Sequence, residues 1–313
     1  MDGAPEKASG RTARVIAQLR QARLSLERVA SPEHRLSSAI RALWRTEARL
    51  NRPLRVAILG EINSGKSALA NLLAGIETAL LPTAVISNTR IPTLLYYASE
   101  PEVWIEHVNG RRERLDGDRS LPRQSTSIFR IDVGLPSQRL RTMQILDLPG
   151  FICPVSGEIV VKPAAHNVDA AIWCTMSTQA WKETERAAWE HLPHRIAARG
   201  VLVATHSDLL RDPNDRQKLR ARLQLEAGES FKSIVLLATQ EALEVVAKDH
   251  RGPSREAWAR SGAERLQSEL EALLLSLREQ RAVAALRMTS RIAGRALVRI
   301  DHGPGGPMLS QAL

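Results

Sequence analysis

Apolar residues near both ends of the chain recur with the spacing of amphipathic helices. The first stripe covers residues 15–29 in steps of four and three, and the second covers residues 36–50. Ser31 and Pro32 lie between them, as a helix cap and a first helical residue commonly do. A third stripe covers residues 266–277. We expect the three stripes to pack against one another as a small helical bundle built from both chain ends.

Between residues 54 and 250, short apolar runs alternate with helical patterns. The expected strands are 54–59, 92–98, 103–108, 127–134, 141–147, 169–175, 201–205 and 233–238. The expected helices are 66–74, 182–192, 213–226 and 240–248. This alternation favours an α/β domain with a mixed, mainly parallel sheet. Asn109-Gly110, between two strand-like runs, predicts a hairpin turn.

Four segments follow from this pattern. Bundle helices are expected in residues 1–53, the α/β domain in 54–250, further bundle helices in 251–302, and a disordered glycine- and proline-rich tail in 303–313. Within the first segment, residues 1–10 are also expected to be disordered.

The stretch GEINSGKS, residues 60–67, joins the first expected strand of this domain to its first helix. Its spacing, G-x-x-x-x-G-K-S, is that of a phosphate-binding loop. The glycines let backbone N–H groups point into a concave nest, and the helix start adds the positive end of its dipole. Lys66 is expected at the β- and γ-phosphates, and Ser67 at Mg²⁺. The residues expected to bind nucleotide here are Gly60, Asn63, Ser64, Gly65, Lys66, Ser67 and Ala68. A chance glycine-rich turn is the alternative, but strand, loop and helix stand in the required order.

The end of a later strand adds residues suited to the phosphates and the metal. The sequence DLPG, residues 147–150, follows the expected strand 141–147. Asp147 suits an outer-sphere contact to Mg²⁺, and the Gly150 N–H can sense a γ-phosphate.

Two more strand ends indicate a guanine base. Thr205, His206 and Asp208 close one apolar strand, and the Asp208 carboxylate can accept both N1–H and N2–H₂ of guanine, a donor pair that adenine lacks. Ala238 and Thr239 close the next strand, where a backbone N–H can meet guanine O6. Together these motifs favour GTP over ATP.

With these motifs the chain resembles the bacterial dynamin-like GTPases over residues 54–250. GEINSGKS resembles their phosphate loop, LLPTAVISNTRIPTLL their switch I, DLPG their third motif, and VDAAIWCTMSTQAWKETERAAWE the region after switch II. The resemblance implies a P-loop GTPase domain with a flanking bundle, and GTP or GDP with Mg²⁺ as ligands. It also implies that Thr89 binds Mg²⁺ and positions the attacking water, with Lys66 and Gly150 as further catalytic residues. Thr83 and Thr93 are weaker candidates for the role of Thr89.

Three features depart from that family. Ile62 stands where many dynamins have a catalytic glutamine, so hydrolysis is expected to be slow, unless Asn63 or an arginine supplied in trans substitutes. His206 stands where the guanine motif usually has lysine, and its ring can stack on the base instead, so guanine selectivity is expected to be weaker but preserved. The chain also has no room for a long stalk or a membrane paddle, so autonomous scission or coat assembly is not expected.

The formal net charge is +10, and all of the excess lies in the flanks. Residues 1–53 carry 11 Lys or Arg against 5 Asp or Glu, residues 251–313 carry 10 against 6, and the segment between them is balanced. The flanks are expected to face an anionic membrane surface or an acidic partner. A solvated arginine-rich surface is an equally weighted alternative. Nucleic acid is disfavoured, because no RNA-binding signature is present.

Several features favour a cytoplasmic protein, peripheral to the inner face of a membrane if it binds one. No signal peptide and no apolar run near the ~18 residues of a spanning helix is found. Cys153 and Cys174 lack metal spacing and suggest reduced thiols. Trp173, Trp181 and Trp189 are expected to be packing residues.

The sequence thus predicts a dynamin-like GTPase that binds and hydrolyses GTP with Mg²⁺ and switches a helical bundle. A nucleotide-dependent homodimer or a paired dynamin-like protein is the expected partner. One alternative is a non-hydrolysing GTP-binding scaffold, in which Ile62 has removed turnover. The other is an RNA-associated GTPase of the ribosome-assembly type, given the basic flanks.

Overall fold

The computed structural model describes residues 4–30, 36–75, 91–115, 127–149, 168–248 and 254–301, with side chains for all of these except 4–9 and 297–301. The chain divides into two compact units. The larger is Leu54–Glu271, and the smaller combines Met1–Pro53 with Ala272–Leu313.

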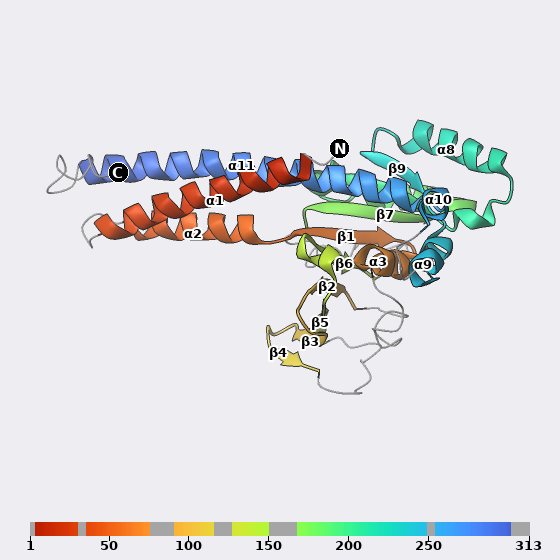
Figure 1. Cartoon of the computed structure of the whole chain (residues 1–313), viewed down its shortest axis with the longest axis horizontal. Coiled ribbons are helices and arrows are strands. Elements are labelled where there is room, and N and C mark those ends of the chain that lie inside the picture. The colour runs from red at the N-terminus through yellow and green to blue at the C-terminus, as the bar shows by residue number, and fades with distance from the viewer. Residues whose placement is uncertain are drawn as a thin grey trace. The chain divides into compact units, whose positions relative to one another are not determined.

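A nine-stranded sheet forms the centre of the larger unit (Figure 1), in the order β4-β3-β5-β2-β6-β1-β7-β8-β9. The strands are β1 (Leu54–Gly60), β2 (Thr93–Tyr97), β3 (Glu102–His107), β4 (Arg112–Arg114), β5 (Ile128–Leu135), β6 (Met143–Asp147), β7 (Ala170–Met176), β8 (Gly200–Thr205) and β9 (Ser233–Leu236). From β6 to β9 all neighbours are parallel, whereas β2 is antiparallel to β6, and β3 is antiparallel to both β5 and β4. The predicted mixed, mainly parallel sheet is therefore confirmed.

The predicted hairpin is confirmed as well, because β3 and β4 pair with Glu106 opposite Arg112. Gly110 adopts a φ of +82°, which a residue with a side chain rarely adopts. The Asn109 side chain accepts a hydrogen bond from the Arg111 N–H at 2.9 Å, as turn asparagines often do.

Helices fill the connections between these strands. In the described part of the larger unit they are α3 (Lys66–Ala74), α6 (Glu183–Glu190), α7 (His194–Ala197), α8 (Pro213–Ala227), α9 (Thr239–Lys248), α10 (Arg255–Arg260) and the first residues of α11 (Ala263–Asp301). The same residues include the short 3₁₀ turns η2 (Gln138–Arg141), η3 (Ser177–Gln179) and η4 (Ser207–Leu209). Helix α3 packs against β1, β6 and α9, which places its first turn at the carboxyl ends of the central strands.

An aromatic core joins the sheet to α6 and α8. Trp173 on β7 is fully buried and packs edge-to-face on Trp181 and Trp189, with ring centroids 6.3 and 5.8 Å away. Leu223 of α8 and Leu202 of β8 belong to the same apolar cluster. The predicted packing role of the three tryptophans is confirmed.

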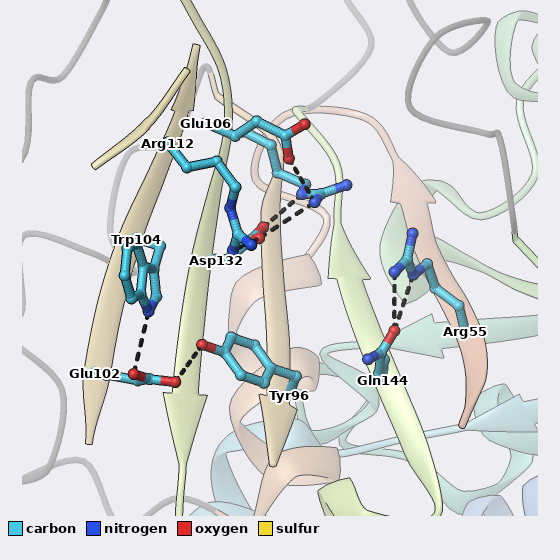
Figure 2. Close-up of polar contacts among 9 residues, drawn as sticks. Arg55, Tyr96, Glu102, Trp104, Glu106, Arg112, Asp132 and Gln144 are labelled. Carbon is cyan, nitrogen blue, oxygen red and sulfur yellow. Dashed lines mark hydrogen bonds and ion pairs between the residues drawn. The ribbon is translucent and has the colours of Figure 1, made fainter. Parts of the chain in front are cut away.

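The strands on the β4 side of the sheet are joined by polar side chains instead (Figure 2). The Asp132 carboxylate accepts hydrogen bonds from Arg112 at 2.9 Å and from Arg130 at 2.5 Å, and its side chain is only 5% exposed. Arg130 also pairs with Glu106 at 2.7 Å. These charge pairs link β3, β4 and β5.

The smaller unit is a bundle of α1 (Ala4–Val29), α2 (Ser37–Asn51) and the part of α11 from Ala272 onward (Figure 1). Its buried apolar cluster comprises Val15, Leu19, Leu26, Leu36, Leu43, Ala282, Ala285 and Ala296. The first two predicted stripes do pack together. The third stripe, residues 266–277, does not join that cluster. Helix α11 contributes the small residues Ala282, Ala285 and Ala296 to the cluster instead, and Leu266 and Leu270 belong to the larger unit.

The expected disorder is wrong for residues 4–10, because α1 begins at Ala4, and residues 1–3 lie outside the described residues. Ala4, Glu6, Lys7 and Ala8 favour a helix, and a proline at position 5 is tolerated in a first turn. The predicted disorder of residues 303–313 lies outside the described residues.

Candidate functional site

The loop between β1 and α3 contains backbone conformations that favour glycine. Gly60 has a φ of +141°, and a Cβ there would lie 2.2 Å from the carbonyl oxygen of Cys174. Gly65, at the start of α3, has a φ of +83°. Asn63 between them is also left-handed, with a φ of +63°. These conformations wind the chain into a tight loop ahead of the N-terminus of α3, the arrangement that binds phosphate in other proteins.

Lys66 and Ser67 are the first residues of α3, and their side chains form hydrogen bonds with the preceding loop and with the end of β6. The Lys66 ammonium donates to the backbone carbonyl of Glu61 at 2.5 Å, and its side chain is largely buried. The Ser67 hydroxyl donates to Asp147 at 2.8 Å, at the end of β6. The structure therefore brings together three residues that the sequence placed at the phosphates and the metal.

Asp147 is the most electrostatically perturbed carboxylate at this site. Burial raises its pKa to about 6, although the hydrogen bond from Ser67 and the charge of Lys66 act in the opposite direction. Its Oδ1 atom is buried and has no hydrogen-bond partner among the described residues. A hydroxyl beside a carboxylate with a free oxygen suits a hard cation such as Mg²⁺, so the donor set fits the predicted metal.

The predicted base-recognition residues lie in the loop after β8. The Thr205 hydroxyl is fully buried and lies 2.7 Å from the carbonyl oxygen of Ser64 and 3.0 Å from Nδ1 of His206. His206 has a φ of +55°, and its ring lies so close to Gly65 that a Cβ there would be 3.3 Å from Cε1. Asp208 follows in η4 and is half-buried. The base loop and the phosphate loop thus meet through Thr205 and His206.

The two residues predicted to approach guanine O6 differ in their contacts. The Ala238 N–H donates to the carbonyl of Ser261 at 2.8 Å, so it is already engaged within the protein. Thr239 begins α9, and its buried hydroxyl has no partner in the described part of the chain. Thr239 therefore remains the candidate at this position.

The remaining predicted residues either lie outside the described ranges or have no contact that assigns them a role. Thr89, Gly150 and the weaker candidate Thr83 lie outside the described residues. Thr93 begins β2 and is paired with Asp147 across the β2–β6 ladder. Ile62, in place of the usual glutamine, is 53% exposed.

Sequence reasoning missed one polar cluster beside the loop, and it gave Glu61 no role. The Glu61 carboxylate accepts hydrogen bonds from Lys182 at 2.9 Å and from the Thr184 hydroxyl at 2.8 Å. Lys182 and Thr184 flank the first residue of α6, 121 and 123 positions from Glu61 along the chain. The only sequence signal was a carboxylate inside a phosphate loop.

Comparison with known proteins agrees with this geometry. Residues 56–206 match the model described as the dynamin family. The chain is 27% identical to Dynamin-like protein 2 of Campylobacter jejuni over 169 residues, which cover 51% of this chain and 27% of that protein. It is 31% identical to Isoniazid-induced protein IniC of Mycobacterium tuberculosis over 152 residues, which cover 44% of this chain and 30% of that protein. The aligned part thus spans less than a third of the length of either relative.

Solved structures share the fold at low identity. One is described as an oligomerised bacterial dynamin pair for the long-range sensing and tethering of membranes, with a TM-score of 0.62, 19% identity, and coverage of 93% of this chain and 55% of that chain. Another, LeoA, is described as a bacterial dynamin GTPase from ETEC, with a TM-score of 0.54, 15% identity, and coverage of 95% and 50%. At these identities the likeness shows the fold.

Proposed function

We propose, from the match of residues 56–206 to the dynamin-family model, that the chain is a GTPase. In this proposal it binds GTP with Mg²⁺ at residues 60–67, hydrolyses it, and passes its nucleotide state to the helical bundle. The observation that carries the proposal is the contact between the phosphate loop and the base loop. The Thr205 hydroxyl donates a hydrogen bond to the carbonyl of Ser64. This bond fixes the two loops relative to each other, so one nucleotide could contact both.

Each end of a guanine nucleotide has a candidate partner. Lys66 and the loop N–H groups suit the phosphates, and Asp208 suits the N1–H and N2–H₂ edge of guanine. Ser67 would hold Mg²⁺ directly and Asp147 would hold it through a water. The bound metal would supply positive charge against the charge that develops on the phosphates.

Ile62 favours a second candidate function, a GTP-binding scaffold with little turnover. An apolar side chain cannot orient an attacking water, and this one is 53% exposed in the loop where the family's glutamine acts. Phosphate release from GTP separates the two functions, with Lys66→Ala as the inactive control. Release above that control supports the GTPase, whereas GTP binding with no release above it supports the scaffold.

We also propose that two copies associate through the nucleotide-binding edge. Ile62 and Leu209 are large apolar residues on the two loops that meet at the site, and they are 53% and 54% exposed. Burying such residues against a second copy would be favourable. Sizing the protein with GDP, a GTP analogue and a transition-state mimic tests this, and an unchanged monomer in all three states would contradict it.

We also propose that the bundle makes a peripheral contact with an anionic membrane. Residues 280–300 of α11 contain five arginines and no acidic residue. Three of these arginines, Arg287, Arg291 and Arg295, are exposed and are called the α11 arginines here. Val283, Leu286 and Met288 are also partly exposed, at 39%, 36% and 49%. A basic helix with apolar residues can bind an anionic surface. In the described part of the chain, no helix is long and apolar enough to cross a membrane.

Cosedimentation with phosphatidylserine vesicles tests this contact. Each basic residue near an anionic surface contributes about 1 kcal/mol at best, so replacing all three α11 arginines with glutamate should abolish most binding at low salt. High salt should weaken binding by the unaltered protein. A triple replacement of Arg211, Lys218 and Arg220, exposed on or near α8, is the matched control. Equal loss in both variants would contradict a role for the bundle.

A further inference from the structure

The phosphate loop contains a carboxylate where a polyphosphate is expected to bind. Glu61 is the only acidic residue between Gly60 and Ser67. It directly follows the first loop glycine, and its own carbonyl oxygen accepts the Lys66 ammonium at 2.5 Å. A negative side chain at this position opposes the binding of a triphosphate unless its charge is compensated.

The structure compensates this carboxylate from the first turn of α6. Lys182 Nζ lies 2.9 Å from one oxygen of Glu61, and the Thr184 hydroxyl donates to the other at 2.8 Å. We call these three side chains the Glu61 clasp. Both carboxylate oxygens are thus engaged by α6. Burial opposes ionisation of Glu61, yet the hydrogen bonds from Lys182 and Thr184, with the charges of Lys182 and Lys66, lower its pKa.

The two donors are held in place by a buried network behind them. The backbone N–H of Lys182 donates to the Glu185 carboxylate at 3.0 Å. Glu185 also accepts from the Thr175 hydroxyl at 2.8 Å and from the Trp173 indole at 3.2 Å. Trp181, just before Lys182, takes a left-handed conformation with a φ of +60°, and its N–H donates to Thr175. The backbone turn that carries Lys182 is therefore fixed by buried contacts, while the Lys182 side chain itself is 42% exposed.

We propose that the Glu61 clasp is a positioning device for the nucleotide: Lys182 neutralises the carboxylate of the phosphate loop, and Lys182 and Thr184 together hold it toward α6, so that the loop retains its affinity for a triphosphate. Lys182 thus acts through Glu61 and does not touch the ligand. This inference rests on the proposed nucleotide site. It adds residues from α6 to that site and assigns a purpose to the acidic residue of the loop.

Equilibrium binding of fluorescent GTP and GDP, and competition by unlabelled guanosine, test the proposal on the full chain. Lys182→Ala should weaken GTP binding about tenfold, as one uncompensated charge near a polyphosphate in a partly screened site would. The loss for GDP should be smaller, and guanosine, which lacks phosphate, should bind unchanged. Lys182→Arg should keep most of the affinity. Lys218→Ala, which removes an exposed lysine of a surface ion pair on α8, is the matched control.

The decisive comparison is the same lysine substitution in a Glu61→Gln background. Once the carboxylate is neutral, Lys182→Ala should cost GTP affinity little or nothing. An equal loss in both backgrounds would overturn the proposal and place Lys182 on the nucleotide itself. No loss in either background would also overturn it. If the unaltered protein binds no guanine nucleotide, the proposed function fails as well, which distinguishes that failure from failure of the clasp alone.

Discussion

Replacing Asp147 with asparagine is expected to stabilise the nucleotide-free protein and to weaken its binding of Mg²⁺ and GTP. Burial raises the pKa of Asp147 from 3.8 to about 6 in the folded state, so the ionised carboxylate costs stability. The stability that comes from the neutral carboxyl group is fully present below pH 3.8 and is lost as the pH rises through 6. The difference between the two pKa values corresponds to about 3 kcal/mol in free energy of unfolding, of which about 2 kcal/mol is lost between pH 4.5 and 8.

Urea unfolding of the nucleotide-free protein at several pH values measures this contribution. Tryptophan fluorescence reports on the larger unit, because Trp173 and Trp189 lie in its core. Relative to the unaltered protein, Asp147→Asn should gain about 2 kcal/mol in free energy of unfolding between pH 4.5 and pH 8. Any fixed cost of the amide cancels from this difference. Asp215→Asn, which removes an exposed carboxylate on α8, is the matched control.

The same variant should bind Mg²⁺ and GTP less tightly at pH 8, because an amide cannot replace a carboxylate near the metal. A stability difference that does not change with pH would refute the argument from burial. So would a gain in stability that appears on acidification.

Three further predictions concern single residues. Asp208→Asn should lower the affinity for GTP and raise that for xanthosine triphosphate in a competition assay, because the 2-oxo group of xanthine needs a donor; an unchanged preference would contradict the base assignment. Gly60→Ala should lower both the melting temperature and nucleotide affinity, since its Cβ would lie 2.2 Å from a carbonyl oxygen, and a variant with wild-type melting would show that the loop is not so confined. Asp132→Ala should lower the free energy of unfolding by about 2–4 kcal/mol in urea, because it leaves Arg130 and Arg112 without the carboxylate they share, whereas a loss under 1 kcal/mol would mean that water replaces it.

The sequence was most informative where chemistry and local structure coincide. The order of strand, GEINSGKS loop and helix predicted the bounds of α3 as the structure has them. It succeeded because two glycines, a lysine and a serine have one common use at that spacing. The alternation of short apolar runs predicted the sheet for a similar reason, since buried parallel strands are apolar throughout.

Contacts between distant segments were the part that could not be predicted. Periodicity shows that a helix has an apolar face but not what covers that face, so residues 266–277 were assigned to the bundle cluster that Ala282 and Ala285 fill. The same limit hid the bond from Ala238 to Ser261, which depends on how the segment after α9 folds back. It also hid the Glu61 clasp, because nothing in the order of residues places α6 beside the loop.

Calorimetric titration of GTP and ATP against the unaltered protein and Lys66→Ala, in the presence of Mg²⁺, tests the central claim most directly. The account predicts that the unaltered protein binds GTP at least tenfold more tightly than ATP. It also predicts that Lys66→Ala loses at least tenfold in GTP affinity. A tenfold loss is about 1.4 kcal/mol, and a charge-assisted hydrogen bond to phosphate contributes at least that much. Equal affinity for the two nucleotides, or unchanged GTP binding by Lys66→Ala, would contradict a guanine-nucleotide site at residues 60–67.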